Sequence, residues 1–177
     1  MKQEIELPEK VEVKLDGSIL TVKGEKGELS RNFAHKNVSI RIEDKKIILF
    51  AEKATKREKT MIGTFKSHVK NMLRGVQRPF VYKMKICASH FPITASVQGD
   101  TFEVKNFLGE KVPRKLKIKP GAKITINAPG ITVESVDKEI AGQVAADIEQ
   151  LTRITDKDTR IFQDGIYITA KDDKVLG

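Results

Sequence analysis

The chain has 177 residues, of which 39% are hydrophobic and 32% charged, and it carries a net charge of +9. This composition is typical of a globular protein with a well-solvated surface. Its single cysteine, Cys87, excludes an intrachain disulfide and favours a reducing compartment, the cytoplasm. No stretch of about 18 apolar residues and no apolar N-terminal segment occur, so we expect neither a membrane span nor a secretion signal.

Two β-hairpins are predicted in the first half. Apolar and polar residues alternate on both sides of an Asp16-Gly17 turn. A period of two is typical of half-buried strands, and Asp-Gly is a strong hairpin signal. A second hairpin is expected from strands at 38–42 and 47–50, joined through 43–46.

The hydrophobic period changes to that of a helix after this hairpin. Thr55 and Glu58 have the spacing of a capping box, and Gly75 with Pro79 is expected to end the helix. Apolar residues recur at helical intervals between these signals. They are Met61, Phe65, Val69, Met72 and Val76.

The second half repeats this order of elements. Apolar residues predict strands around 81–86, at Val97, Phe102 and Val104, and around 116–118, 124–126 and 131–133, followed by a helix over 135–153 and a last strand over 165–168. The boundary between the halves is expected near Pro79, just before the strand that opens the second half.

Segments of the two halves also match in sequence. Residues 16–23 (DGSILTVK) recur 82 residues later as 98–105 (QGDTFEVK), and the helical residues 61–72 recur at an offset of 79 as 140–151. The matches fall on glycines and apolar positions while the polar residues between them differ. This is the pattern that two copies of one folded core retain.

We therefore predict an α+β protein made of two similar domains that arose by internal duplication, residues 1–80 and 81–177. Each domain is expected to be a mostly antiparallel sheet with one helix packed on one face. The matched glycines Gly63 and Gly142 lie inside the two helices, where glycine costs about 1 kcal/mol relative to alanine. Their positions predict close helix-to-sheet packing in both copies.

The positive charge predicts a polyanionic partner, with nucleic acid preferred to an acidic membrane because no basic amphipathic anchor accompanies the charge. Residues 1–80 carry 18 Lys and Arg against 11 acids, and residues 81–177 carry 15 against 13. The densest cluster is nonetheless in the second half, where residues 105–123 hold seven cations and one acid. We expect the ordered loop at 106–114 to present cations to phosphate groups.

A second basic feature lies on the first predicted helix. Four cations follow one face, about a third of a turn from the apolar stripe: Lys59, Lys66, Lys70 and Arg74. Any solvated helix face shows the same pattern, so we treat this one as a secondary basic face.

Groups able to perform chemistry are sparse. Cys87 and His90 lie three residues apart, a spacing that on a strand or turn does not point the two groups at each other, and no third orienting residue is evident. The three histidines are too scattered for a metal site, and one cysteine cannot build a structural zinc site. Gly24 and Gly27 lack the context of a nucleotide-binding loop. We expect no enzymatic activity, no cofactor, no metal and no small-molecule substrate.

The C-terminal region carries a long motif with fixed spacing. Its members are Gln150, Ile154, Lys157, Arg160, Phe162, Asp164, Gly165, Ile166, Tyr167, Ile168 and Lys171. The motif resembles the C-terminal signature of the archaeal and eukaryotic branch of the large-subunit ribosomal protein six family. Residues 63–75, 82–84, 90–93 and 106–111 also resemble that family, so the likeness covers essentially the whole chain. The bacterial branch ends instead in a Tyr-Lys-Gly-Lys-Gly type segment, which this chain lacks.

The resemblance implies a duplicated α+β protein of the cytoplasm that is not an enzyme and binds large-subunit ribosomal RNA. It also implies a place near the sarcin–ricin loop at the base of the factor-binding stalk, beside other large-subunit proteins, with residues 81–177 making most of the RNA contact. The archaeal type of tail favours an archaeal source. The alternative is a cytosolic nucleic-acid- or protein-interaction module outside the ribosome.

The charge pattern and the resemblance together predict ten RNA-binding residues. They are Lys105, Lys111, Arg114, Lys115, Lys117, Lys157, Arg160, Gly165, Tyr167 and Lys171. Gly165 would permit close approach of the backbone, and Tyr167 could stack on a base or hydrogen-bond. The start of an ordinary strand with a half-buried tyrosine accounts for these two residues equally well.

Overall fold

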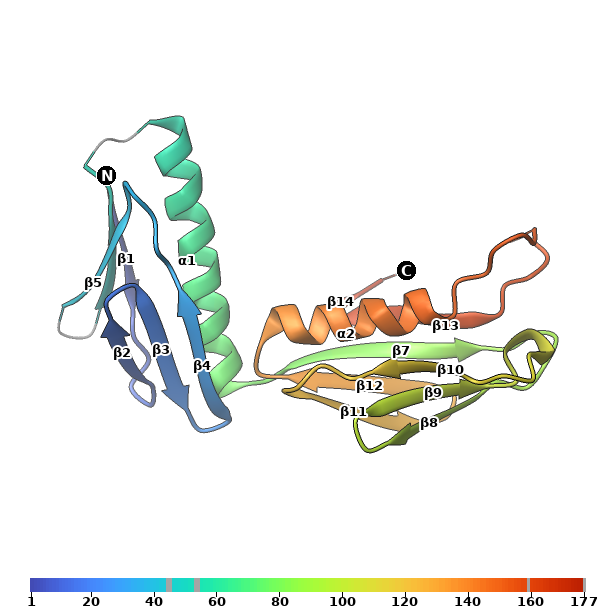
Figure 1. Cartoon of the computed structure of the whole chain (residues 1–177). Helices are drawn as coiled ribbons and strands as arrows, with labels where there is room; N and C mark the ends of the chain where they lie inside the picture. Colours follow the sequence, from blue (N-terminus) through green and yellow to red (C-terminus); the bar gives the residue numbers. More distant parts are fainter. Residues whose placement is uncertain (44–45, 53–54, 159, 177) are drawn as a thin grey trace. The chain divides into compact units, whose positions relative to one another are not determined.

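A computed structural model describes residues 1–43, 46–52, 55–158 and 160–176 of the chain (Figure 1). The chain divides into two compact units, Met1–Pro79 and Phe80–Gly177, called unit 1 and unit 2 below. Both combine antiparallel sheets with one α-helix, which is the predicted α+β class. Among the described residues, neither helix has an apolar stretch long enough to cross a membrane.

Unit 1 consists of two three-stranded sheets and a long helix. The elements are β1 (Lys2–Glu6), β2 (Glu12–Asp16), β3 (Ile19–Gly24), β4 (Gly27–Asn32), β5 (Ser39–Glu43), β6 (Lys46–Phe50) and α1 (Lys56–Gln77). The sheet orders are β2-β3-β4 and β1-β6-β5, with every pair antiparallel. Helix α1 lies along these strands and contacts both sheets (Figure 1).

The two predicted hairpins of unit 1 are confirmed. Strands β2 and β3 pair from Asp16 opposite Ile19, and Gly17 in the turn has a left-handed φ of 59° that suits glycine. Strands β5 and β6 form the second hairpin, whose connection at residues 44–45 lies outside the described part of the chain. Strand β1 was missed because only one of its side chains, Ile5, is buried.

Helix α1 begins where the capping-box spacing placed it, although the contacts differ from those of a standard box. The Thr55 hydroxyl donates to the Glu58 carboxylate instead of capping a backbone N–H, and Glu58 also accepts a hydrogen bond from Asn37 Nδ2 at 2.9 Å. The helix continues past Gly75 to Gln77, so Gly75 does not end it. On the packed face, Ile62 is fully buried where Met61 was expected.

Unit 2 has the same kinds of element with an extended sheet. They are β7 (Phe80–Cys87), β8 (Thr94–Gln98), β9 (Thr101–Lys105), the short 3₁₀ turn η1 (Phe107–Gly109), β10 (Arg114–Lys117), β11 (Ala122–Asn127), β12 (Gly130–Ser135), α2 (Lys138–Leu151), β13 (Gly165–Lys171) and β14 (Lys174–Val175). The sheet orders are β8-β9-β10 and β11-β12-β7-β13-β14, again antiparallel throughout.

The internal duplication is visible in the strand orders. The meander β2-β3-β4 recurs as β8-β9-β10, and β5-β6-β1 recurs as β11-β12-β7, with a helix following each set. The matched turn glycines Gly17 and Gly99 even share a φ, at 59° and 58°. Unit 2 then adds two strands, β13 and β14, beside β7, and these two strands have no counterpart in the described part of unit 1.

Each unit buries its own hydrophobic core. In unit 2, helix α2 packs Val144 and Ile148 against aromatic and aliphatic side chains of the sheet, including Phe80, Phe102 and Ile166, all with at most 1% of their surface exposed. Burial of such side chains contributes roughly 1.5–3 kcal/mol each. The cores therefore make each unit a rigid platform for the loops at its ends.

The prediction from the paired helix glycines is half wrong. A Cβ at Gly142 would lie 3.2 Å from the Tyr82 hydroxyl, so α2 does approach its sheet closely at this point. A Cβ at Gly63 would meet nothing within 4 Å, because Gly63 is on the exposed face of α1. The sequence match at this position does not reflect a shared packing role.

Candidate nucleic-acid interface

Three loops meet at one end of unit 2. The first follows β7 and spans residues 88–93, the second connects β9 to β10 and spans 106–113, and the third follows α2 and spans 152–164, of which residue 159 lies outside the described part of the chain (Figure 1). We call this group the three-loop end. Each loop exposes one large apolar side chain: Phe91 is 47% exposed, Val112 77% and Ile161 63%.

Arg114 ties loop 106–113 to the end of α2. Its guanidinium donates to both carboxylate oxygens of Glu110, at 2.8 and 2.5 Å, and to the carbonyls of Leu151 and Arg153, at 2.8 and 3.3 Å. Its Cζ lies 4.3 Å from the ring centroid of buried Phe107. The hydrogen bonds and charge of Arg114 hold the pKa of the Glu110 carboxyl below its ordinary value.

The carbonyls that Arg114 reaches belong to a helix C-terminus, where backbone acceptors lack partners within the helix. A cation there also interacts favourably with the helix dipole. The Arg114 guanidinium is therefore engaged inside the protein at every described contact, and its predicted role toward RNA remains a prediction. The structure gives it a role in ordering the loop.

The lysines of β9 and β10 lie on the outer face of the β8-β9-β10 sheet. Lys115 and Lys117 are exposed and alternate with the more buried Arg114 and Leu116, as strand geometry requires. Lys115 lies directly opposite Glu103, a charged residue that is only 6% exposed. Glu103 bridges Lys105 and Lys115, with Nζ-to-carboxylate distances of 3.4 and 3.6 Å.

Lys111 lies in the loop itself and is exposed. The outer face and the loop together therefore present four of the predicted lysines, one of whose charges is offset by Glu103. These are Lys105, Lys111, Lys115 and Lys117.

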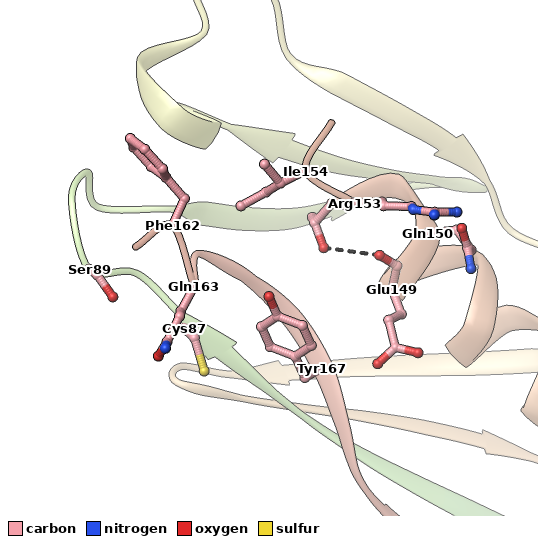
Figure 2. A pocket seen from close by; sticks show the side chains of 10 residues that line it. Cys87, Ser89, Glu149, Gln150, Arg153, Ile154, Phe162, Gln163 and Tyr167 are labelled. Atoms are coloured by element: carbon pink, nitrogen blue, oxygen red, sulfur yellow. Dashed lines mark hydrogen bonds between the residues drawn. The ribbon is translucent and has the colours of Figure 1, made fainter. Parts of the chain in front are cut away.

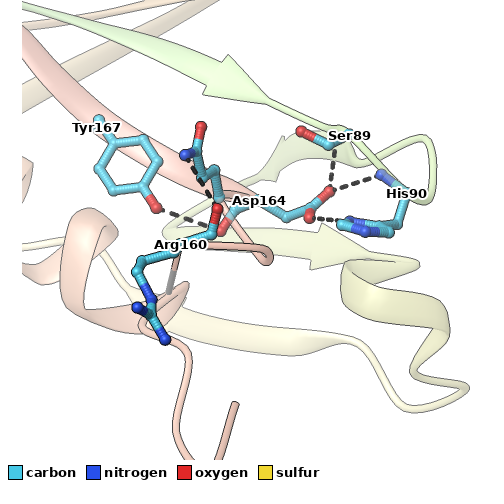
Figure 3. A network of polar contacts seen from close by, with 6 residues as sticks. Ser89, His90, Arg160, Asp164 and Tyr167 are labelled. Atoms are coloured by element: carbon cyan, nitrogen blue, oxygen red, sulfur yellow. Dashed lines mark hydrogen bonds and ion pairs between the residues drawn. The ribbon is translucent and has the colours of Figure 1, made fainter. Parts of the chain in front are cut away.

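Asp164 ties loop 152–164 to the loop that follows β7 (Figure 3). Its carboxylate, 1% exposed, accepts hydrogen bonds from the backbone N–H groups of Ser89 and His90, at 2.6 and 3.0 Å, and contacts His90 Nδ1 at 2.6 Å. Burial opposes ionisation, but these hydrogen bonds and the His90 charge outweigh it and hold the pKa of Asp164 below its ordinary value. The His90 ring also stacks on Phe162, with centroids 4.7 Å apart.

His90 therefore has an orienting acid that sequence reasoning missed. Asp164 is 74 residues away in sequence, and as a member of the C-terminal motif it carries no signal of this contact. Cys87 takes no part in the contact and instead lines a neighbouring cavity. Among the described residues, no group of three His, Cys, Asp or Glu side chains is placed to hold a metal ion.

The two predicted cations of loop 152–164 are exposed and make local contacts. Lys157 Nζ lies 4.8 Å from the Phe162 ring centroid, and Arg160 forms a bidentate pair with Asp158, with its closest contact at 2.7 Å. The hydrogen bond from Arg160 to Asp158 raises the pKa of the guanidinium. Exposed pairs of this kind contribute little to stability, so exchange of Asp158 for a phosphate would cost little.

Gly165 and Tyr167 begin β13 and contact each other. A Cβ at Gly165 would lie 3.0 Å from the Tyr167 ring, so the missing side chain leaves room for this ring. The Tyr167 hydroxyl donates to the Asp164 carbonyl at 3.4 Å, and the residue stays 42% exposed. Lys171 is at the opposite end of β13, opposite Tyr82 and about 20 Å along the strand, and does not join the three-loop end.

The secondary basic face is in unit 1. Lys59, Lys70 and Arg74 are exposed on α1, whereas Lys66 is half-buried and donates to Gln3 Oε1 at 2.6 Å. Three of the four cations are therefore exposed on α1 and Lys66 has a partner within the protein, while the role of this face toward RNA stays a prediction.

A cavity of about 800 Å³ opens beside Tyr167, between the end of α2, the end of β7 and loop 152–164 (Figure 2). Its lining consists of Cys87, Ser89, Glu149, Gln150, Thr152, Arg153, Ile154, Phe162, Gln163 and Tyr167. Two of these residues also satisfy the free edge of β13. Thr152 Oγ1 accepts from Ile166 N at 2.9 Å, and Glu149 Oε1 accepts from Ile168 N at 3.1 Å.

Comparison with known proteins matches both units to one protein family. The family model described as "Ribosomal protein L6" matches twice, over residues 7–78 and 91–165, once in each unit. Curated relatives named "Large ribosomal subunit protein uL6" are 42% identical in Methanospirillum hungatei, 41% in Methanococcus vannielii and 44% in Aeropyrum pernix. The matches cover 94–99% of this chain and 92–97% of the relatives. The chain therefore belongs to the ribosomal protein L6 family.

Proposed function

We propose that this protein is an RNA-binding structural component of the large subunit of the cytoplasmic ribosome, and that unit 2 makes its principal contact with ribosomal RNA. The RNA site proposed is near the sarcin–ricin loop at the base of the factor-binding stalk, beside other large-subunit proteins. Membership of a ribosomal, non-enzymatic family supports the general function. The finer location rests on the resemblance of the C-terminal motif.

The observation that carries the choice of unit 2 is the three-loop end. Hydrogen bonds from Arg114 and to Asp164 join three loops that are far apart in sequence, so the loops that carry these cations are held next to one another. Preorganised cations bind phosphates without the entropic cost of ordering a flexible segment. Lys111, Lys157 and Arg160 on these loops would contact phosphate oxygens and set the position of the RNA.

The test is a charge-removal variant that spares the folded structure. Lys111, Lys115 and Lys117 are replaced together by alanine, and Arg114 is left unchanged because its contacts order the loop. Binding is measured to a transcribed large-subunit RNA fragment that contains the sarcin–ricin loop, over a range of salt concentrations. We expect weaker binding and a salt slope smaller by about one for each phosphate that the variant no longer neutralises.

A matched control removes the same charge from unit 1. Lys14, Lys23 and Lys36 are exposed on β2, β3 and the segment before β5, and their triple alanine variant should change affinity much less. Equal effects of the two variants would show that only net charge matters and would refute unit 2 as the principal RNA contact. Release from large subunits in a high-salt wash would instead favour the interaction module outside the ribosome.

The basic face of α1 is proposed as a secondary RNA surface. Lys59 and Lys70 replaced by alanine test it, since both are exposed and Lys66 is bound to Gln3. We expect a smaller loss of affinity than for the lysines of unit 2. A larger loss would move the principal contact to unit 1.

A further inference from the structure

The cavity beside Tyr167 has a shape that is already built in the free protein (Figure 2). The side of the cavity formed by α2 is held by Thr152 and Glu149, whose side chains bind the free edge of β13. The opposite side is held by Asp164, which bonds the loop after β7, and by the stacking of His90 on Phe162. Its volume of about 800 Å³ falls within the range of roughly 300–1,000 Å³ found for small-molecule sites.

The lining combines an aromatic ring with groups that read the edge of a planar ligand. Tyr167 lines the cavity and is 42% exposed, whereas the Phe162 ring already contacts His90 and Lys157. Burial, with nearby Cys87, Asp164 and Glu149, raises the pKa of Tyr167, so its ring is neutral at physiological pH. Gln150 offers a side-chain amide, which can both donate and accept hydrogen bonds.

The remaining polar groups complete the chemistry of a nucleotide. Glu149 uses Oε1 for Ile168 N, which leaves its second oxygen to accept from a ring or amino N–H. Arg153 is exposed at the rim of the cavity, where its guanidinium can reach a phosphate. The cavity thus offers an aromatic face, an amide, a carboxylate and a cation at its rim, a set that matches an unpaired nucleotide. An apolar ligand would leave the polar groups without partners, and an acidic peptide would be repelled by the charge of Glu149.

We propose that this cavity binds one unpaired nucleobase of the ribosomal RNA, stacked on Tyr167, with its phosphate at Arg153. The proposal rests on the proposed function and names a contact of a different kind from the phosphate contacts of the lysines. Proteins that recognise RNA with sequence preference commonly hold splayed-out bases on aromatic side chains in this way.

The first test compares Tyr167→Leu with Tyr167→Phe, which keeps the aromatic ring. Binding to the same large-subunit RNA fragment is measured over a range of salt concentrations. We expect Tyr167→Leu to weaken binding about tenfold with an unchanged salt slope, since stacking on an aromatic residue contributes at this level. Tyr167→Phe should bind like the wild type. Folding of both variants is checked through the fluorescence of Tyr82, which remains in each.

The second test uses a variant at the solvent-exposed end of α2, Gln150→Ala, and a small probe. Guanosine 5′-monophosphate should shift the NMR signals of Tyr167 and of the Gln150 side-chain amide more than ribose 5-phosphate does, because the latter offers the phosphate for Arg153 but has no base. Gln150→Ala should weaken the response to the nucleotide.

The outcomes separate this proposal from the general function. Equal shifts with both probes, or a Tyr167→Leu variant that binds RNA like the wild type, would overturn the base-binding cavity. The proposed function would survive either result, provided that removal of Lys111, Lys115 and Lys117 still weakens RNA binding and lowers its salt slope.

Discussion

The buried carboxylate of Asp164 should be among the most important single groups for the stability of unit 2. Asp164→Ala removes the acceptor of three hydrogen bonds, from Ser89 N, His90 N and His90 Nδ1. Hydrogen bonds to a charged group contribute about 1.5–3 kcal/mol each. Because Ser89 and His90 are themselves exposed, water can replace part of this stabilisation. We therefore expect the free energy of unfolding of unit 2 to fall by about 3 kcal/mol.

Tyrosine fluorescence measures this change in unit 2 alone. The chain has no tryptophan, and both of its tyrosines, Tyr82 and Tyr167, belong to unit 2. A urea titration followed by this signal therefore avoids the problem that a two-unit chain does not unfold in one step. The matched control is Asp158→Ala, an acid of the same loop that pairs only with exposed Arg160 at its described contacts. Equal stability of the two variants would refute the role of Asp164.

The pH dependence follows from the lowered pKa of Asp164. A carboxyl whose pKa is lower in the folded state than its ordinary value of 3.8 stabilises the protein fully above that value, and this stabilisation disappears as pH falls through the folded pKa. The stability difference between the wild type and Asp164→Asn should thus be greatest at neutral pH and shrink below about pH 4. A difference that stayed constant down to about pH 2 would show that the carboxylate charge is not involved.

Two further predictions concern the Arg114 contacts and the helix glycines. Arg114→Ala should lower the free energy of unfolding of unit 2 by about 2 kcal/mol. Arg114→Lys should not restore this stability, because a lysine has no planar group that reaches both Glu110 and the Leu151 carbonyl. Urea titration with tyrosine detection measures both variants. Gly63→Ala should stabilise unit 1 by about 1 kcal/mol through its higher helix propensity, and so raise its melting temperature. Gly142→Ala should stabilise unit 2 less, or destabilise it, because the added Cβ would crowd the Tyr82 hydroxyl. Calorimetry on the two variants distinguishes these effects.

The periodicity of the sequence predicted most of the fold because it reflects local burial. The hairpin at Asp16-Gly17 needed only two alternating segments and a turn signal, and both are local. Strand β1 was missed because its burial depends on pairing with β6, more than 40 residues later, and not on its own pattern. The helix glycines show the converse error, in which a local match suggested a shared environment that only Gly142 has.

The organisation of the candidate site could not be predicted in the same way. Charge density drew attention to residues 105–123, but it treated Arg114 as one more cation. Its role depends on the carbonyls at the end of α2, which lie 37 and 39 residues further along the chain. Asp164 likewise acts on residues 74 and 75 positions earlier. Such contacts are set by the topology, and the residue types alone do not indicate them.

The differences between the two copies of the fold argue for unit 2 as the principal RNA contact. The connection between β3 and β4 has two residues, whereas its counterpart between β9 and β10 has eight. After α2, unit 2 also adds loop 152–164 and the strands β13 and β14. Loops of this length cost conformational entropy, which a purely structural copy has no reason to spend.

In unit 2 both of these added loops lie at the three-loop end, and both are fixed by side-chain contacts, of Arg114 with Glu110 and of His90 with the buried Asp164. The same additions supply Lys111, Lys157 and Arg160, three of the predicted phosphate ligands, together with much of the cavity beside Tyr167. A duplicated domain that remained a simple scaffold would need neither the longer loops nor the bonds that order them. Their concentration at one end is what a specialised binding surface requires, and it outweighs the larger net charge of residues 1–80.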